Sequence, residues 1–198
     1  MNLYTKNIGK TFSGVNVLRE VDFELEQGEV HALVGENGAG KSTFVKVLSG
    51  VYTPTKGNIY LDDRKVQINT PISAQKNGIS LIHQEPQSFS HLSVAENIFM
   101  GHMDGSNFSR VKWKDINKSS EKILSSIGLE IDPKNIMEGL SIADQQMIEI
   151  AGALSKNSKI LIMDEPTSPL TPNEVGKLFN IVKQLKDQGM AIIFISHR

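Results

Sequence analysis

The stretch that decides the fold reads Gly35-Glu36-Asn37-Gly38-Ala39-Gly40-Lys41-Ser42-Thr43. It matches the pattern Gly-x-x-x-x-Gly-Lys-Ser, whose glycines let successive backbone N–H groups surround phosphate oxygens. The apolar run at 30–34 predicts a buried strand before it, and residues 44–50 predict a helix after it. Strand, glycine loop and helix N-terminus form the context that a phosphate-binding loop needs. A glycine-rich turn without a ligand is the alternative, and this context disfavours it.

Two residues of the loop carry specific chemistry. We expect the Lys41 ammonium to reach the β- and γ-phosphates of a nucleoside triphosphate and the Ser42 hydroxyl to ligate Mg²⁺. A nucleoside triphosphate with Mg²⁺ is therefore the predicted ligand. The loop residues predicted to hold it are Gly35, Glu36, Asn37, Gly38, Ala39, Gly40, Lys41, Ser42 and Thr43.

Two carboxylates follow a second apolar run. Residues 160–163 predict a buried strand, and Asp164 and Glu165 come directly after it. A strand that ends in acids places charge at the carboxyl edge of the sheet, where α/β proteins bind ligands. We expect Asp164 to hold Mg²⁺ through water and Glu165 to be the general base for an attacking water. A polar turn that merely ends the strand is the alternative, and the phosphate loop makes it the weaker one.

Composition sets broad limits on the class of protein. The chain has 198 residues, a formal net charge of −1, 39% hydrophobic residues and no cysteine. These values are ordinary for a globular protein and exclude disulfides and thiolate metal sites. No run of Lys or Arg marks a nucleic-acid footprint, and apolar runs such as 191–195 are too short to cross a bilayer. The amino terminus carries no signal-peptide pattern, so we expect a cytoplasmic location.

Strand and helix patterns alternate unevenly along the chain. The stretch 93–155 differs from the rest because it carries helix patterns and no strand pattern. We therefore expect one α/β domain over 1–198, with a helical subdomain inserted at 93–155, rather than a plain doubly wound sheet. The predicted strands are 21–25, 29–34, 58–61, 79–82, 160–163 and 191–194, and the predicted helices of the insertion are 94–100, 114–127 and 144–154.

The last predicted helix has clear local signals. Thr171-Pro172-Asn173-Glu174 supplies an N-cap, a proline at the first helical position and a capping-box glutamate. Apolar residues at helical spacing predict a core-facing side that consists of Val175, Leu178, Phe179, Val182 and Leu185.

In their order along the chain these motifs resemble those of the ATP-binding cassette (ABC) ATPases. The glycine loop and the Asp164-Glu165 pair stand in the places of that family's Walker A and Walker B motifs. Gln84 matches the Q-loop glutamine, which in the family meets Mg²⁺ and moves with the membrane partner. Phe12 matches the aromatic that stacks on adenine, and His197 matches the switch histidine that contacts the γ-phosphate. Ser168-Pro169-Leu170-Thr171 occupies the place of the D-loop.

This resemblance covers essentially the whole chain and implies a fold and a site. The fold is a P-loop NTPase core, a mixed sheet flanked by helices, with an inserted α-helical subdomain and an N-terminal antiparallel β region. The implied cofactors are ATP and Mg²⁺. The implied catalytic residues are Glu165, His197 and Gln84, and the implied metal site consists of Ser42, Gln84 and Asp164.

The family's signature segment, usually Leu-Ser-Gly-Gly-Gln, is altered here to Leu140-Ser141-Ile142-Ala143-Asp144. In the family this segment faces the γ-phosphate of ATP held by the opposite cassette, so Ser141 is a predicted nucleotide contact. Ile142 and Ala143 add side chains where glycine allows a close backbone approach. The Asp144 carboxylate repels phosphate unless it serves the N-terminus of its own helix. We expect the ATP site that this segment completes to hydrolyse poorly.

Three stretches resemble the carbohydrate-importer branch of bacterial ABC ATPases, with its ribose-, galactose- and xylose-type members. They are residues 28–41, 94–101 and 165–172, and residues 12–18 and 84–86 also resemble the importer of the sugar-like signal autoinducer-2. Members of that branch carry two cassettes in one polypeptide, and this chain resembles most of the first. We expect a cassette truncated at its C-terminus, whose exposed last strand lacks neighbours and weakens its independent stability.

The resemblance implies an ATP-hydrolysing subunit that energises import of a sugar or sugar-like solute. Its implied partners are transmembrane permease subunits, a second ABC cassette in the same polypeptide or in a homodimer, and indirectly a periplasmic or extracellular solute-binding protein. Its implied place is the cytoplasmic face of a bacterial cell membrane. Two alternatives remain. A non-hydrolysing ATP-binding regulatory module is favoured by the altered signature, and a soluble ABC ATPase acting on nucleic acid or ribosomes is disfavoured by the absence of basic patches.

Overall fold

The computed structural model describes residues 1–101 and 112–196. The chain forms two compact units. The first comprises Met1–Leu81, Ser158–Glu165 and the residues from Leu185 onward, and the second comprises Ile82–Asn157 and Pro166–Gln184. The chain therefore leaves the first unit and returns to it twice, and the range 93–155, where a helical stretch was expected, falls within the second unit.

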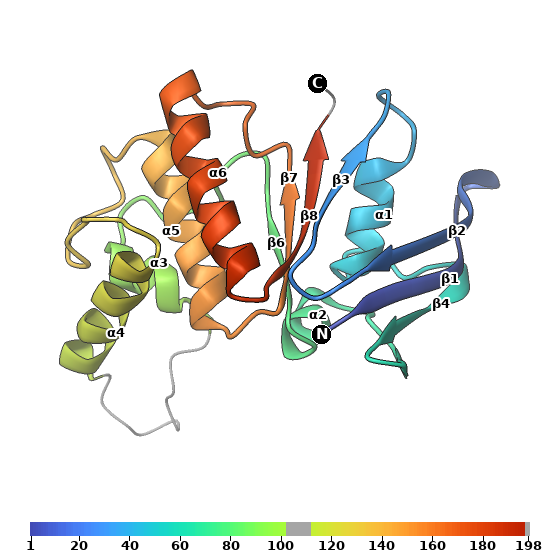
Figure 1. Cartoon of the computed structure of the whole chain (residues 1–198), viewed down its shortest axis with the longest axis horizontal. Coiled ribbons are helices and arrows are strands. Elements are labelled where there is room, and N and C mark those ends of the chain that lie inside the picture. Colours follow the sequence, from blue (N-terminus) through green and yellow to red (C-terminus); the bar gives the residue numbers. More distant parts are fainter. Residues whose placement is uncertain (102–111, 197–198) are drawn as a thin grey trace. The chain divides into compact units, whose positions relative to one another are not determined.

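An antiparallel sheet begins the first unit (Figure 1). It contains β1 (Leu3–Phe12), β2 (Val15–Leu25), β4 (Lys56–Leu61) and β5 (Arg64–Val66) in the order β2-β1-β4-β5. Ser13 and Gly14 join β1 to β2 with φ angles of 45° and 84°, which suit a two-residue hairpin turn. The N-terminal antiparallel region expected from the family resemblance is confirmed, although β1 itself carried no clear strand pattern.

A parallel sheet forms the other part of the first unit. It contains β3 (Val30–Val34), β6 (Ile79–Ile82), β7 (Ile160–Asp164) and β8 (Ala191–Ser196) in the order β3-β8-β7-β6. The residues of β7 and β8 are almost entirely buried, as expected for strands covered on both faces. α1 (Lys41–Leu48) shares one hydrophobic core with both sheets. The predicted α/β fold of the ABC ATPases is confirmed.

Two expectations about the strands are wrong. β3 is an edge strand rather than a buried one, and Val34 is 67% exposed. The last strand, β8, has neighbours on both sides, because it pairs in parallel with β3 and with β7. Both errors have one cause. The order of strands in a sheet depends on pairing between distant segments, which a local apolar pattern does not reveal.

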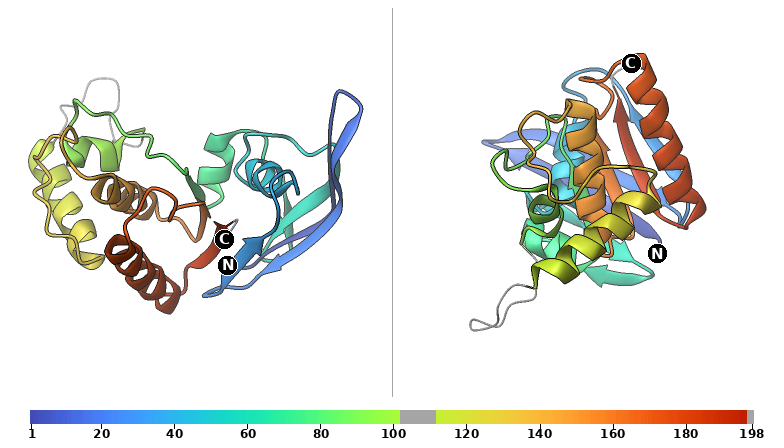
Figure 2. Two further views of the ribbon diagram at one scale, coloured as in Figure 1. Left: turned by 90° about the horizontal axis from the view of Figure 1, so that it is seen from above. Right: turned by 90° about the vertical axis from the view of Figure 1, so that its left-hand side faces the viewer.

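Helices dominate the second unit (Figure 2). α3 (Val94–Phe99), α4 (Trp113–Ser126) and α5 (Ile142–Ser155) pack on one another. Their bounds differ from the predicted ones by at most two residues. α2 (Pro71–Lys76) is a short helix of the first unit that was not predicted. Within residues 1–101 and 112–196, no helix is long and apolar enough to cross a membrane.

α6 (Pro172–Asp187) begins as its sequence signals predict. The backbone N–H and the hydroxyl of Thr171 both donate to Oε2 of Glu174, each at 2.8 Å. One apolar residue was misassigned. Phe179 is 49% exposed, and Ile181 is buried instead.

Candidate functional site

The loop between β3 and α1 has the backbone of a phosphate-binding loop. Gly38 and Gly40 have φ angles of 85° and 93°, values that side chains disfavour. A Cβ atom on Gly40 would also lie 2.9 Å from Cδ2 of Leu18 and 3.2 Å from the carbonyl oxygen of Val17. Glycine is therefore required at position 40 both by the backbone angle and by the close approach of β2.

The side chain of Lys41, in the first turn of α1, folds back onto this loop. Its Nζ donates to the carbonyl oxygens of Gly35 at 2.6 Å and Glu36 at 3.0 Å. The first turn of α1, which the structure describes completely, contains no acidic residue, and its N-cap has no side-chain hydrogen bond. The free N–H groups and the positive end of the helix dipole favour an anion at this helix start.

The first predicted carboxylate lies at the same edge of the sheet as the start of the loop. Val34, the last residue of β3, pairs with Ser196 of β8, and Asp164, the last residue of β7, pairs with the adjacent Ile195. The ends of β3 and β7 are therefore level and separated by two strand spacings, roughly 10 Å. This register places Asp164 across β8 from the phosphate loop.

Glu165 turns the chain away from β7. Its φ is 48°, in the left-handed region, and its backbone N–H donates to the carbonyl oxygen of Ile195 at 3.2 Å. Such a backbone costs free energy for a residue other than glycine and is common at functional sites. A glutamate held in this conformation is consistent with a role that needs its side chain.

Phe12 is only partly covered at the end of β1. Its ring packs edge-on against Tyr52, with 5.0 Å between centroids, and Nζ of Lys10 lies 5.0 Å from the centre of the Phe12 ring. Phe12 pairs with Val15 in the hairpin, and Val17 and Leu18 of the same β2 strand lie where a side chain on Gly40 would be. The same hairpin thus carries Phe12 and supports the loop. Tyr52 was not singled out from the sequence, because a lone aromatic after a helix gives no signal.

Two predicted site residues lie in the second unit. Nε2 of Gln84 lies 3.5 Å from Oγ of Ser168, at the limit of a hydrogen bond. Their approach joins the predicted Q-loop to the predicted D-loop. The contacts of Gln84 and Ser141 with nucleotide stay predictions, and His197 lies outside the described residues.

Ser141 and Asp144 form two reciprocal hydrogen bonds at the start of α5. Ser141 is the N-cap, and its Oγ accepts the backbone N–H of Asp144 at 3.1 Å. The same hydroxyl donates to Oδ2 of Asp144 at 2.8 Å. The adjacent Ile142 is 50% exposed, whereas Ala143 is buried. The Asp144 carboxylate therefore does serve its own helix, but it also holds the hydroxyl proton of Ser141.

Comparison with known proteins identifies the family. A family model for ABC transporters matches residues 18–168. The chain belongs to the ABC transporter family. The ribose import ATP-binding protein RbsA 2 of Streptomyces avermitilis is 48% identical over 99% of this chain, and a putative ribose/galactose/methyl galactoside import ATP-binding protein of Geobacillus kaustophilus is 46% identical over 97%. The chain spans 39% and 38% of their lengths, respectively.

Solved ABC cassettes share the fold. The ADP conformation of MJ1267, an ATP-binding cassette of an ABC transporter, has a TM-score of 0.88 and 28% identity, over 100% of this chain and 82% of that one. The cassette CbiO1 of Clostridium perfringens has a TM-score of 0.84 and 28% identity, over 99% and 78%. The MJ1267 structure is that of its ADP conformation, so nucleotide is a ligand of that cassette.

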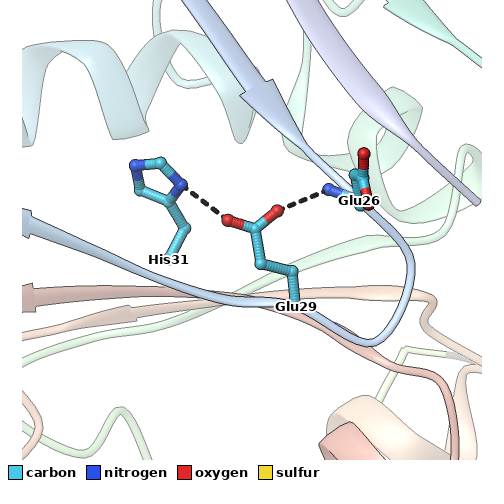
Figure 3. Close-up of polar contacts among 3 residues, drawn as sticks. All are labelled: Glu26, Glu29 and His31. Atoms are coloured by element: carbon cyan, nitrogen blue, oxygen red, sulfur yellow. Dashed lines mark hydrogen bonds and ion pairs between the residues drawn. The ribbon is translucent and has the colours of Figure 1, made fainter.

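In this ABC cassette a polar and aromatic group supports the strand before the loop (Figure 3). Nδ1 of His31 lies 2.9 Å from Oε1 of Glu29, and the backbone N–H of Glu26 donates to Oε2 of Glu29 at 2.8 Å. The bond from Glu26 is the main reason that the pKa of the Glu29 carboxyl lies below its usual value. Phe23 packs edge-on against His31 and against Phe44 of α1. His31 thus joins β3 to the core beneath α1.

Proposed function

We propose that this chain binds ATP with Mg²⁺ and hydrolyses it to energise import of a sugar or sugar-like solute through an ABC transporter. The observation that carries the ATPase part is the register of β3, β8 and β7, which sets Asp164 level with the start of the phosphate loop. The sugar-import part is supported by relatives named as ribose and galactose import ATP-binding proteins.

The residues of the first unit have separate roles in this proposal. The loop amides and the N-terminus of α1 hold the phosphates, and Lys41 exchanges its bonds to the loop carbonyls for phosphate oxygens. Ser42 would supply a hard oxygen ligand, which suits Mg²⁺, and Asp164 would hold the ion through water. When bound, Mg²⁺ neutralises charge on the β- and γ-phosphates. Glu165 accepts a proton from the attacking water, and Phe12 stacks on the adenine.

The family resemblance assigns further groups to the complete site. We propose that Gln84 and His197 contact the metal and the γ-phosphate, and that a second cassette, in the same polypeptide or in a homodimer, supplies the opposite signature. The share of the relatives' length that this chain covers, 39%, suits the first of two cassettes. Transmembrane permease subunits then receive the motion at the cytoplasmic face of the membrane, and a solute-binding protein delivers the solute.

The altered signature makes the two nucleotide sites unequal. The Ser141 hydroxyl donates its single proton to the Asp144 carboxylate, so it is not free to donate to a γ-phosphate. This occupied donor favours poor hydrolysis at the site that Ser141 completes. The site on this chain's own loop is completed by the other signature and stays active. A regulatory module without hydrolysis is the second candidate, and the same contact favours it.

Calorimetric titration with MgATP, beside a steady-state ATPase assay, tests the proposal. We expect binding by the wild-type chain and a loss of at least about ten-fold in affinity for Lys41→Ala, because the ammonium faces the phosphates. Lys65→Ala, on β5, is the matched control and should bind as the wild type does. Binding that survives Lys41→Ala unchanged would contradict the site, and binding without hydrolysis in the assembled transporter would favour the regulatory module.

A further inference from the structure

Two neighbouring residues after Gln84 are hydrogen-bonded to α5. The backbone N–H of Gln87 donates to Oε1 of Glu149, and the hydroxyl of Ser88 donates to Oε1 of Gln145 at 3.0 Å. Gln145 and Glu149 are four residues apart and therefore lie on one face of the helix. That face of α5 holds residues 87–88.

Gln145 also contacts the residues in front of α5. Its Nε2 donates to the carbonyl oxygen of Leu140 at 3.0 Å. Leu140 begins the altered signature segment, so one side-chain amide joins Ser88 on one side to the signature on the other. A displacement of Ser88 has a direct route to the backbone next to Ser141.

The next residue of the same loop is anchored elsewhere. The backbone N–H of Phe89 donates to Oδ1 of Asn97 at 2.8 Å, and Nδ2 of Asn97 donates to the carbonyl oxygen of Phe89 at 3.1 Å. Asn97 belongs to α3, not to α5. Residues 87–88 are thus joined to the signature helix, and Phe89 is joined to a different one.

The side chains in this link are partly sheltered from solvent, whereas Gln87, which contributes its backbone N–H, is exposed. Ser88, Gln145 and Glu149 are all partly buried, and Glu149 interacts with the neighbouring Lys156. A hydrogen bond lost in such a place is replaced less completely by water than one on the surface. Loss of the bond between Ser88 and Gln145 therefore carries a cost in free energy.

We propose that Gln145 and Glu149 are positioning residues that couple the segment after Gln84 to the signature segment. Movement of residues 87–88 then changes how well ordered the backbone of residues 140–145 is. The inference rests on the proposed function, in which the Gln84 segment follows the permease and Ser141 faces the opposite nucleotide. Gln145 and Glu149 set where Ser141 stands when the permease moves.

Hydrogen–deuterium exchange on the full chain, measured with and without MgATP, tests the coupling. The readout is the pair of amides of Asp144 and Gln145, which bond to Ser141 Oγ and to the Ser141 carbonyl oxygen. We expect Ser88→Ala to speed their exchange roughly five-fold, the effect of losing one ordinary hydrogen bond. Ser90→Ala, the same change two residues further along the loop, is the matched control and should leave them unchanged.

Two further variants separate the link from general loosening. Gln145→Glu keeps an acceptor for Ser88 but removes the donor to Leu140, and it should speed the same amides. Ser88→Thr keeps the hydroxyl and should restore slow exchange. The double variant Ser88→Ala with Gln145→Glu should be no faster than the faster single one, because both changes interrupt one path.

Three results would overturn the coupling. They are unchanged exchange at Asp144 and Gln145 in Ser88→Ala, equal acceleration in Ser90→Ala, and effects that simply add in the double variant. The proposed function is read separately in the same samples, from protection of residues 35–43 on addition of MgATP. Protection there with no change at the signature would refute the coupling alone, whereas coupling without that protection would refute the nucleotide site alone.

Discussion

The hydroxyl of Ser141 donates to the carboxylate of Asp144, with 2.8 Å between Oγ and Oδ2. In return, that hydroxyl caps the helix by accepting the Asp144 backbone N–H. The pair stabilises the start of α5 and occupies the one side chain of the signature that was expected to meet a γ-phosphate. The hydrogen bond that strengthens the helix cap thus opposes the γ-phosphate contact that we propose for Ser141.

Restoring the family signature should raise the ATPase rate of the assembled transporter. The triple change Ile142→Gly, Ala143→Gly and Asp144→Gln removes the crowding side chains and the charge. We expect roughly a two-fold higher steady-state rate, because a second site becomes active. Asp115→Asn, in the first turn of α4, is the control. An unchanged rate would show that the altered signature does not limit hydrolysis.

Replacing Glu165 by Gln should separate binding from turnover. The amide keeps the size of the side chain and leaves the left-handed backbone in place, but it cannot accept a proton from water. Affinity for MgATP should stay near the wild-type value while hydrolysis falls by about 10²- to 10⁴-fold. Glu24→Gln, on the exposed side of β2, is the matched variant. Full hydrolysis by Glu165→Gln would remove this residue as the base.

The stability of the chain should depend on the charge of Glu149. Burial raises the pKa of this carboxyl to about 7, against opposing effects of the Gln87 N–H and Lys156. Burial also lowers the pKa of Lys156. The unfolded chain therefore releases the Glu149 proton at lower pH than the folded chain does. The contribution of the neutral Glu149 carboxyl to folding stability is complete below about pH 4.5 and is lost as the pH rises through 7.

Denaturant unfolding at pH 5 and pH 8 measures this effect. Glu149→Gln has no ionisable group at this position. From pH 5 to pH 8 the free energy of unfolding of the wild type should therefore fall by about 2 kcal/mol relative to that of the variant. The same change at the exposed Glu121 of α4 is the control. A constant difference across this range would mean that Glu149 does not titrate there.

Gln146 should be replaceable with a gain in stability. It is fully buried in α5, and neither amide atom has a hydrogen-bond partner in the described part of the chain. Methionine fills a similar volume without a polar group, so Gln146→Met should raise the free energy of unfolding by about 1 kcal/mol. Thermal unfolding would show this as an increase of roughly 2–4 °C in Tm. A lower Tm would show that the amide is satisfied in solution.

Local chemistry made much of this protein predictable. The glycine loop, the capping by Thr171 and Glu174 and the two acids at the end of β7 each depend on residues close together in the sequence. The bounds of α3, α4 and α5 followed from their apolar spacing in the same way. The family resemblance supplied the antiparallel region that the pattern of β1 did not show.

The sequence by itself determined which residues form the glycine loop before α1, where the main helices begin and that two acids end a buried strand. Tertiary structure alone decided that β3 lies at the edge, that β8 lies between β3 and β7, and that Gln145 bridges Ser88 to Leu140. The physical reason is the separation along the sequence between the residues that interact. Helix caps and tight turns are set within a few residues, whereas strand order and side-chain bridges depend on packing between segments far apart in the chain.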